Sequence, residues 1–321
     1  MSEANGSATP IEKRYDFAYY FDITDGNPNG DPDAGNLPRI DPETGQGLVT
    51  DVCLKRKIRN YVGVAKGEQP PYEIYVKERA ILNKQHDRAW QAVEPKATAI
   101  AKKNLPEDAK KARELTAWMC RNFFDIRAFG AVMTTDVNCG QVRGPIQLGL
   151  ARSLHPVVSQ EFTVTRCAVT TEAESERQEG GNRTMGRKFA IPYGLYRVHG
   201  YVNPKLAGAP AGTGFNNDDL DLLKQALNMM FEGDKSAARA NMRPVACIAF
   251  QHENPLGNAR ADQLFSRVRC LPKAGVQPLP AQSDGQSGEG RPPRSFEDYD
   301  LSVDESKLPA GITVESWIDW R

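Results

Sequence analysis

The feature that most constrains the fold is a regular alternation of side chains near the start of the chain. Over residues 15–23, every odd-numbered residue is apolar or aromatic. An extended chain places alternate side chains on opposite faces, so these residues share one face. The alternation predicts a half-buried strand over residues 15–24. Tyr20 lies on the other face, where it either stacks on a nucleic-acid base or packs beneath a neighbouring loop.

A loop dense in turn-forming residues follows this strand. Residues 25–36 contain Asp, Asn, Gly or Pro at nearly every position, which cannot continue a strand. The spacing of Asp25, Asn27 and Asn29 begins like a calcium-binding helix-loop-helix. Asn36 stands where the closing Glu is required, however, and a strand precedes the loop in place of a helix. We therefore expect no metal here, and either a solvated loop or amides and Asn side chains beside a ligand.

A basic helix is predicted over residues 50–62. Thr50 is suited to the N-cap, and Asp51 suits the positive end of the helix dipole. Apolar residues at helical spacing form one buried stripe, and Lys55, Arg56 and Arg59 fall on the other side. No acidic residue occurs between positions 52 and 65 to pair with them. This pattern favours phosphate contacts, and a solvated helix face is the alternative.

The remaining elements complete an α+β fold. Residues 64–122 read as a charged helical insertion, 217–231 as an amphipathic helix, and 123–133, 144–154 and 244–251 as strands. Together with the opening strand and helix, they give the order β-α-β-β-α-β. This is the ferredoxin-like arrangement of RRM domains, although no RNP aromatic motif is evident.

A long hairpin is predicted from residues 162–170 and 189–202, with a basic tip between them. Residues 181–188 superficially resemble a phosphate-binding P-loop, but Arg187 and Lys188 replace its Lys and Ser/Thr, so nucleotide hydrolysis is not expected. An exposed Met185 on such a tip suits a wedge beside an RNA base. An ordinary surface loop is the alternative.

Charge is balanced overall but unevenly distributed. The chain has 41 basic and 41 acidic residues, yet residues 180–217 contain no acid, and residues 284–321 contain nine acids against four bases. A chain polarised in this way can bind a polyanion on one face or meet its own copies. The six cysteines show no CxxC pair, which indicates reduced thiols and no zinc site. No apolar run approaches ~18 residues and no signal segment is evident, so a cytoplasmic location is expected.

Several segments closely resemble one protein family. They are FDITDGNPNGDP (21–32), TDVCLKRKIR (50–59), FFDIRAFGAVM (123–133), GPIQ (144–147), SLHP (153–156), TMGRK (184–188) and PYGLY (192–196). In these segments the chain resembles the repeated backbone subunit of the type I-C CRISPR surveillance complex, Cascade. The matching segments are spread over most of the chain, which makes them far more specific than one short motif.

The resemblance implies a hand-shaped protein with an RRM-like palm, helical fingers and a β-hairpin thumb. The implied palm comprises residues 1–63, 123–161 and 190–272, with fingers at 64–122 and a thumb at 162–189. A flexible linker at 273–294 and C-terminal palm strands at 295–321 complete the chain.

The resemblance also implies a binding role without catalysis, cofactor or metal. Its implied partners are CRISPR RNA, further copies of the chain in a helical filament, other Cascade subunits at the filament ends, and target DNA. No membrane contact is expected. The candidate RNA-contacting residues are Asn27, Asn29, Arg39, Lys55, Arg56, Arg59, Arg143, Ser153, Arg183, Met185, Arg187, Lys188, Arg239 and Arg243.

The rival hypothesis is a metal-dependent ribonuclease. Asp25, Asp31 and Asp33 lie close together in the turn-rich loop. Clustered carboxylates of this kind can hold divalent ions for phosphodiester cleavage.

Overall fold

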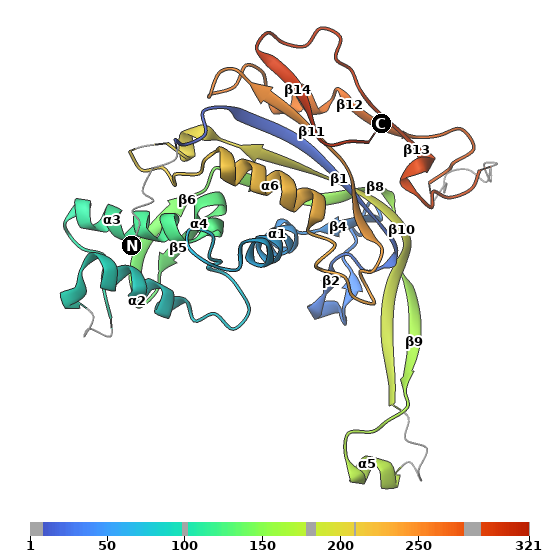
Figure 1. Cartoon of the computed structure of the whole chain (residues 1–321). Helices are drawn as coiled ribbons and strands as arrows, with labels where there is room; N and C mark the ends of the chain where they lie inside the picture. The colour runs from blue at the N-terminus through green and yellow to red at the C-terminus, as the bar shows by residue number, and fades with distance from the viewer. Residues whose placement is uncertain (1–8, 98–101, 178–183, 209, 279–289, 321) are drawn as a thin grey trace.

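The alternating residues form the central strand of a large antiparallel sheet (Figure 1). The computed structural model describes residues 9–97, 102–177, 184–208, 210–278 and 290–320. The strands follow the order β14-β11-β1-β10-β8-β4, with β7 and β9 paired to β10. Their bounds are β1 Arg14–Gly26, β4 Gln46–Val49, β7 Ile146–Leu148, β8 Ala151–Pro156, β9 Gln160–Arg166, β10 Thr184–Val202, β11 Met242–His252 and β14 Ile312–Ile318.

Two helices cover one face of this sheet. They are α1 (Asp51–Lys66) and α6 (Asn217–Met229), close to the predicted ranges. The Thr50 side chain accepts a hydrogen bond from the Cys53 amide, and Asn216 begins a capping box, so both N-termini are satisfied. Their apolar stripes pack against the odd-numbered residues of β1 in the main core.

A second layer covers the other face. It consists of the ribbon β12 (Val268–Pro272) and β13 (Tyr299–Val303) together with α7 (Ala261–Phe265). Tyr20 is fully buried in the cluster beneath this layer. The expectation of a half-buried β1 is therefore wrong, because the strand is covered on both faces, and Tyr20 is not a stacking platform.

The expected β-α-β-β-α-β succession is present, but its middle strands differ from those predicted. Insertions aside, the chain runs β1, α1, β8, β10, α6, β11, and the four strands lie side by side as β11-β1-β10-β8. Residues 124–129 are the helix α4 (Phe124–Phe129), and β5 (Gly130–Thr134) pairs with β6 (Asn138–Arg143) outside the main sheet. Every residue of α4 is buried, so its sequence lacks the polar face by which a helix is recognised.

A separate helical unit lies beside the sheet. Its core is the third apolar cluster of the protein. This cluster is built from α2 (Leu82–Val93), α3 (Ala109–Asn122), α4 and the β5–β6 ribbon. The helix at the end of the hairpin is α5 (Glu172–Arg177). The short elements are β2 (Gly30–Asp31), β3 (Leu37–Pro38), η1 (Pro32–Ala34), η2 (Pro95–Ala97), η3 (Pro204–Leu206) and η4 (Phe296–Asp298).

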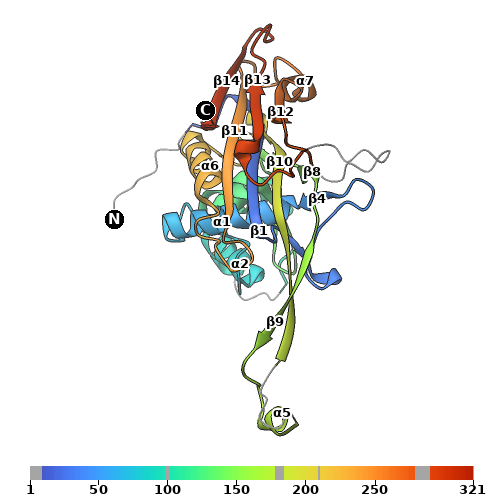
Figure 2. The same ribbon diagram turned by 90° about the vertical axis from the view of Figure 1, so that its right-hand side faces the viewer.

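The hairpin extends away from the body of the protein (Figures 1 and 2). The first half of β10 pairs with β9, while its second half lies in the main sheet. All seven residues of β9 are exposed, so this element is held by backbone pairing and not by a core. Among the described residues, no helix is both long and apolar enough to cross a bilayer.

Candidate nucleic-acid interface

Two basic residues of α1 are paired with acids from distant parts of the chain. Lys57 forms an ion pair with Asp234, and the Arg59 Nε lies 2.8 Å from the Asp125 Oδ2. The side chains of Lys57 and Arg59 are only 5% and 12% exposed. The expectation of an unpaired basic face is therefore wrong at these positions, because the partners lie far outside residues 52–65.

Lys55 and Arg56 differ in how tightly they are held. The Lys55 Nζ lies 2.9 Å from the Asp51 Oδ2, and its ammonium group also faces the Phe129 ring. Arg56 pairs with Glu78, and their side chains are 63% and 80% exposed. An exposed ion pair of this kind contributes little, so a phosphate can replace Glu78 at small cost. Of the four basic residues at positions 55–59, Arg56 has the most exposed side chain and is the one available to a ligand.

The loop of residues 232–241 contacts α1 through the ion pair between Asp234 and Lys57. We call it the junction loop. Its Asp234 accepts a hydrogen bond from the Arg239 Nε at 2.8 Å in addition to the Lys57 pair. Arg239 is therefore directed inward to Asp234. Its role here is to neutralise a carboxylate that already faces α1.

The junction loop also connects the hairpin to the turn-rich loop. The Lys188 Nζ donates to the Ala237 carbonyl at 2.8 Å, and the Asn27 amide donates to the Ala238 carbonyl at 2.7 Å. Three segments distant in sequence thus meet at this loop: the hairpin base, the loop after β1, and α1.

The asparagines of the turn-rich loop maintain its shape. The Asn29 Oδ1 accepts from the Thr50 amide at 3.0 Å and from the Thr50 hydroxyl at 3.1 Å. Asn27 is buried and donates to the Asn36 carbonyl at 2.8 Å. Arg39 pairs with Asp31 at 3.2 Å. Each of these side chains thus has a partner in or next to the loop, although the buried Asn27 Oδ1 and Arg39 Nε have none among the described residues. Through Asn29 and Thr50 the loop is tied to the start of α1.

Two further predicted contacts are also engaged inside the protein. Ser153 is 1% exposed, and its hydroxyl accepts from the Gly47 amide and donates to the His155 carbonyl, so it has no free face for RNA in this structure. Arg243 binds both oxygens of buried Asp22, at 3.0 and 3.2 Å. Burial raises the pKa of Asp22, against the opposing effects of Arg243 and the Tyr193 hydroxyl. Arg243 still exposes 55% of its side chain.

The hairpin carries the most accessible of the predicted residues. Met185 is 76% exposed, and Arg187 pairs with Glu161 at 3.2 Å on the surface. The neighbouring strand exposes Phe162 and Val164, and Phe162 is the register partner of Lys188, so the hairpin presents both apolar and basic side chains. Arg183 lies outside the described residues, as do residues 279–289 of the predicted linker at 273–294.

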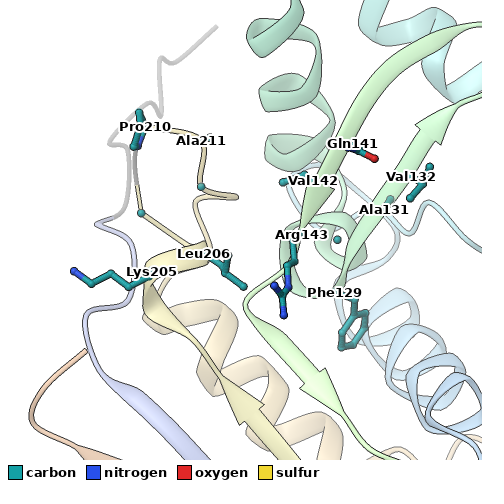
Figure 3. Close-up of a pocket in the computed structure, with 13 residues that line it drawn as sticks. Phe129, Ala131, Val132, Gln141, Val142, Arg143, Lys205, Leu206, Pro210 and Ala211 are labelled. Carbon is teal, nitrogen blue, oxygen red and sulfur yellow. The ribbon is translucent and has the colours of Figure 1, made fainter. Parts of the chain in front are cut away.

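A groove of about 790 Å³ lies between the β5–β6 ribbon and the loop after β10 (Figure 3). Arg143 and Lys205 line it from opposite sides, and Phe129 lies at the end nearest α1. No acid among the described residues forms an ion pair with Arg143. Lys205 was not predicted as a contact, although it lies in the acid-free segment 180–217.

The backbone beside this groove is unusually tight. Gly130 has a φ of 79°, and a Cβ there would lie 2.4 Å from the Gly144 amide nitrogen. Any other residue at position 130 would therefore push the backbone segments at Gly130 and Gly144 apart. The small residues of this segment permit a close backbone approach that fixes Phe129 next to Arg143.

Neither a metal site nor a reactive thiol stands out. Across the described ranges, no three His, Cys, Asp or Glu side chains are grouped so that they could hold a metal ion. Asp31 pairs with Arg39 and accepts from the Asp33 amide at 3.2 Å. All six cysteines are free, and burial raises the pKa of Cys120, Cys139 and Cys270 to about 12.

Comparison with known proteins identifies relatives of this chain. Residues 13–304 match the family described as CRISPR-associated protein Cas7. A CRISPR-associated protein Cas7 from Haloferax volcanii is 26% identical over 206 residues, which cover 59% of this chain and 56% of that protein. The match thus spans little more than half the length of the relative.

Two solved chains give weaker structural matches. A chain of a CRISPR RNA-guided surveillance complex, pre-nicking, has a TM-score of 0.45 at 13% identity, covering 74% of this chain and 78% of that chain. A chain of a CRISPR RNA-guided surveillance complex has a TM-score of 0.38 at 15% identity, covering 74% and 68%.

Proposed function

The chain belongs to the Cas7 family of CRISPR-associated proteins, and from this premise we propose that it is a CRISPR RNA-binding backbone subunit of a Cascade complex. We assign it to type I-C on the sequence segments that resemble that subtype. In this proposal, copies polymerise head to tail along the guide in the cytoplasm, and other Cascade subunits bind at the ends. The guide is thereby presented for pairing with target DNA.

The proposal assigns a part to each structural unit. The β1–α1–β8–β10–α6–β11 unit is an RRM-like palm, the α2–α4 unit forms the fingers, and the β9–β10 hairpin is the thumb. The observation that carries the proposal is the junction loop. It holds the hairpin base, the turn-rich loop and α1 together, so that one strand of RNA can cross all three.

The available cations give the expected contacts. Arg56, Arg143, Lys205 and Arg187 face solvent or the groove and are not buried in ion pairs. Positive side chains of this kind bind the sugar-phosphate backbone without reading sequence. The buried pairs of Lys57 and Arg59 hold α1 in place instead.

RNA binding tests this proposal directly. The purified chain should bind single-stranded RNA of unrelated sequences with similar affinity, and the affinity should fall as salt rises. Changing Arg143 to Ala should weaken binding to all of these sequences alike and reduce the salt slope by about 0.7. Fluorescence anisotropy across a salt series measures both quantities. An RNA-free chain that ignores polyanions at low ionic strength contradicts the proposal.

We further propose that the subunit breaks no bond. The rival ribonuclease would use Asp31, whose carboxylate is instead occupied by Arg39 and a backbone amide. Incubating the purified complex with guide, complementary RNA and magnesium should leave the RNA intact. Cleavage that is lost in Asp31→Ala would establish the ribonuclease.

A further inference from the structure

A second hollow lies over β8 and β10 of the main sheet, on the face opposite α1 and α6. Its volume is about 410 Å³. Arg197, His199 and Tyr201 of β10 line it at every second position. Tyr196, Val198 and Val202, which point to the opposite face, belong to the core under the helices. Polar side chains thus gather on one face of the sheet, over β8 and β10.

Two arginines stand directly opposite each other in this hollow. Arg152 of β8 is the register partner of Arg197 of β10. Like charges in directly opposed positions are unfavourable, because their Cβ atoms lie only about 5 Å apart. The Arg152 Nη1 is compensated by the Asp41 Oδ2 at 2.5 Å. No carboxylate among the described residues forms an ion pair with Arg197, so one positive charge remains uncompensated.

His199 leaves a second group unsatisfied. Its ring stacks on Phe265 with centroids 3.9 Å apart, and its buried Nε2 has no hydrogen-bond partner in the described part of the chain. Burial and nearby Arg197 lower the pKa of His199 to about 4, so the ring is neutral at physiological pH. A neutral imidazole can still donate one hydrogen bond to an oxygen.

The strand itself carries a pattern known from RNA recognition. Residues 197–202 read RVHGYV. The RNP1 signature of RRM domains begins with a basic residue, places aromatic residues at its third and fifth positions with a small one between, and continues with Val. Val198 departs from the Gly of that signature, and His199 replaces its first aromatic residue. The sequence predicts residues 189–202 as a strand of the hairpin. Only the strand order of the structure shows that they form a middle strand of the sheet, where an RNP1 signature is expected.

We infer that this hollow binds a backbone phosphate of single-stranded RNA, with Arg197 and Arg152 as its charge partners. The inference rests on the proposed RNA-binding function and adds a contact site that lies apart from α1 and the groove of Figure 3. A phosphate, and not a base, is the ligand, because Phe265 already covers the stacking face of His199. An anion between the two guanidinium groups would remove their repulsion.

Charge removal at Arg197 tests the site. In Arg197→Gln, affinity for labelled single-stranded RNA should fall about tenfold at low salt, and the slope of log affinity against log salt should decrease by about 0.7. Arg197→Lys should keep the slope but bind more weakly, because an ammonium group lacks the planar fork of guanidinium. Thermal unfolding of Arg197→Gln should occur at the same temperature or higher, since a like-charge contact is removed.

Arg260→Gln is the matched control. Arg260 is exposed, pairs with Asp262 and lies outside both proposed contact regions, so its loss removes one charge without removing a contact. Equal effects of Arg260→Gln and Arg197→Gln would overturn the inference. If Arg197→Gln fails to fold, Arg152→Gln provides the same test from the opposite strand.

The remaining outcomes separate this inference from the proposed function. Wild-type protein that does not bind RNA contradicts the function itself. Wild-type binding with an unchanged affinity and slope in Arg197→Gln contradicts only the site. Single-stranded DNA of the same length should show the same slope change if the phosphate is what is bound, and a loss confined to DNA would reject the RNA assignment.

Discussion

Single ion pairs determine which basic side chains of this protein are free to meet a ligand. Lys57 and Arg59 lie on the same helix as Arg56, but their carboxylate partners are largely buried and that of Arg56 is exposed. A buried pair cannot lose one member cheaply, because the other charge then remains in a poorly solvated site. An alanine scan of α1 therefore reports stability at some positions and binding at others.

This distinction yields a prediction for Arg59→Ala and Arg56→Ala. Loss of Arg59 leaves the buried Asp125 carboxylate, within the described part of the chain, with the backbone amides of Tyr75 and Val76, at 2.8 and 3.1 Å. We expect Arg59→Ala to lower the free energy of unfolding by about 3 kcal/mol. Arg56→Ala, the control on the exposed face, should change it by less than about 0.5 kcal/mol. Urea unfolding followed by circular dichroism measures both, and equal effects would show that the Arg59 pair is not structural.

At the scale of elements, β10 connects two regions with different sources of stability. Its second half lies in the centre of the main sheet, with buried residues on both sides of the strand. Its first half pairs only with the fully exposed β9. The hairpin therefore adds surface without adding core. The position of its β10 strand is set by the pairing of the second half of β10 in the main sheet. This suits an element that contacts something outside its own chain.

Shortening the hairpin tests this separation. Thr163 and Arg187 are register partners, so residues 164–186 can be replaced by an Asn-Gly turn between them. The free energy of unfolding should stay within about 0.5 kcal/mol of the full-length value, because no buried apolar area is lost. Under the proposed function, RNA affinity should drop. Met185→Ala is the milder companion, and a large loss of stability in either variant would mean that the hairpin packs on the body.

At the scale of the whole molecule, a net charge of zero conceals an uneven distribution. The segment 180–217 supplies β10 and Lys205, whereas the acid-rich residues 284–321 supply β13 and the edge strand β14. β14 lies at one end of the sheet order and β10 lies inside it (Figure 1), whereas β13 packs in the second layer against β10. A basic region and an acidic region on one molecule favour contact between successive copies over pairing of like faces.

This polarity predicts assembly that depends on RNA length. Mixed with single-stranded RNAs of increasing length, the chain should form particles whose mass rises in steps of one 35.5 kDa protomer. Native mass spectrometry resolves such steps. Because the contacts between protomers and with RNA are partly electrostatic, high salt should dissociate the particles. A fixed stoichiometry for all RNA lengths would contradict polymerisation along the guide.

Local patterns predicted those parts of the fold in which neighbours in sequence share one environment. The helices α1 and α6 and the strands β1 and β11 follow from apolar periodicity and from caps within a few residues. The turn-rich loop and the hairpin were likewise evident in composition. Such features depend on interactions within one turn of helix or one strand, so the sequence alone contains them.

Long-range pairing decided the rest. Arg59 and Asp125 are separated by 66 positions and Lys57 and Asp234 by 177, and no local pattern links them. The same limit concealed α4, whose residues are all buried, and the second layer that covers Tyr20. Burial of a charge or a ring depends on which distant segment packs over it. The sequence by itself therefore determined the basic helix, the hairpin and the family resemblance, and only the tertiary structure decided which cations are free to bind.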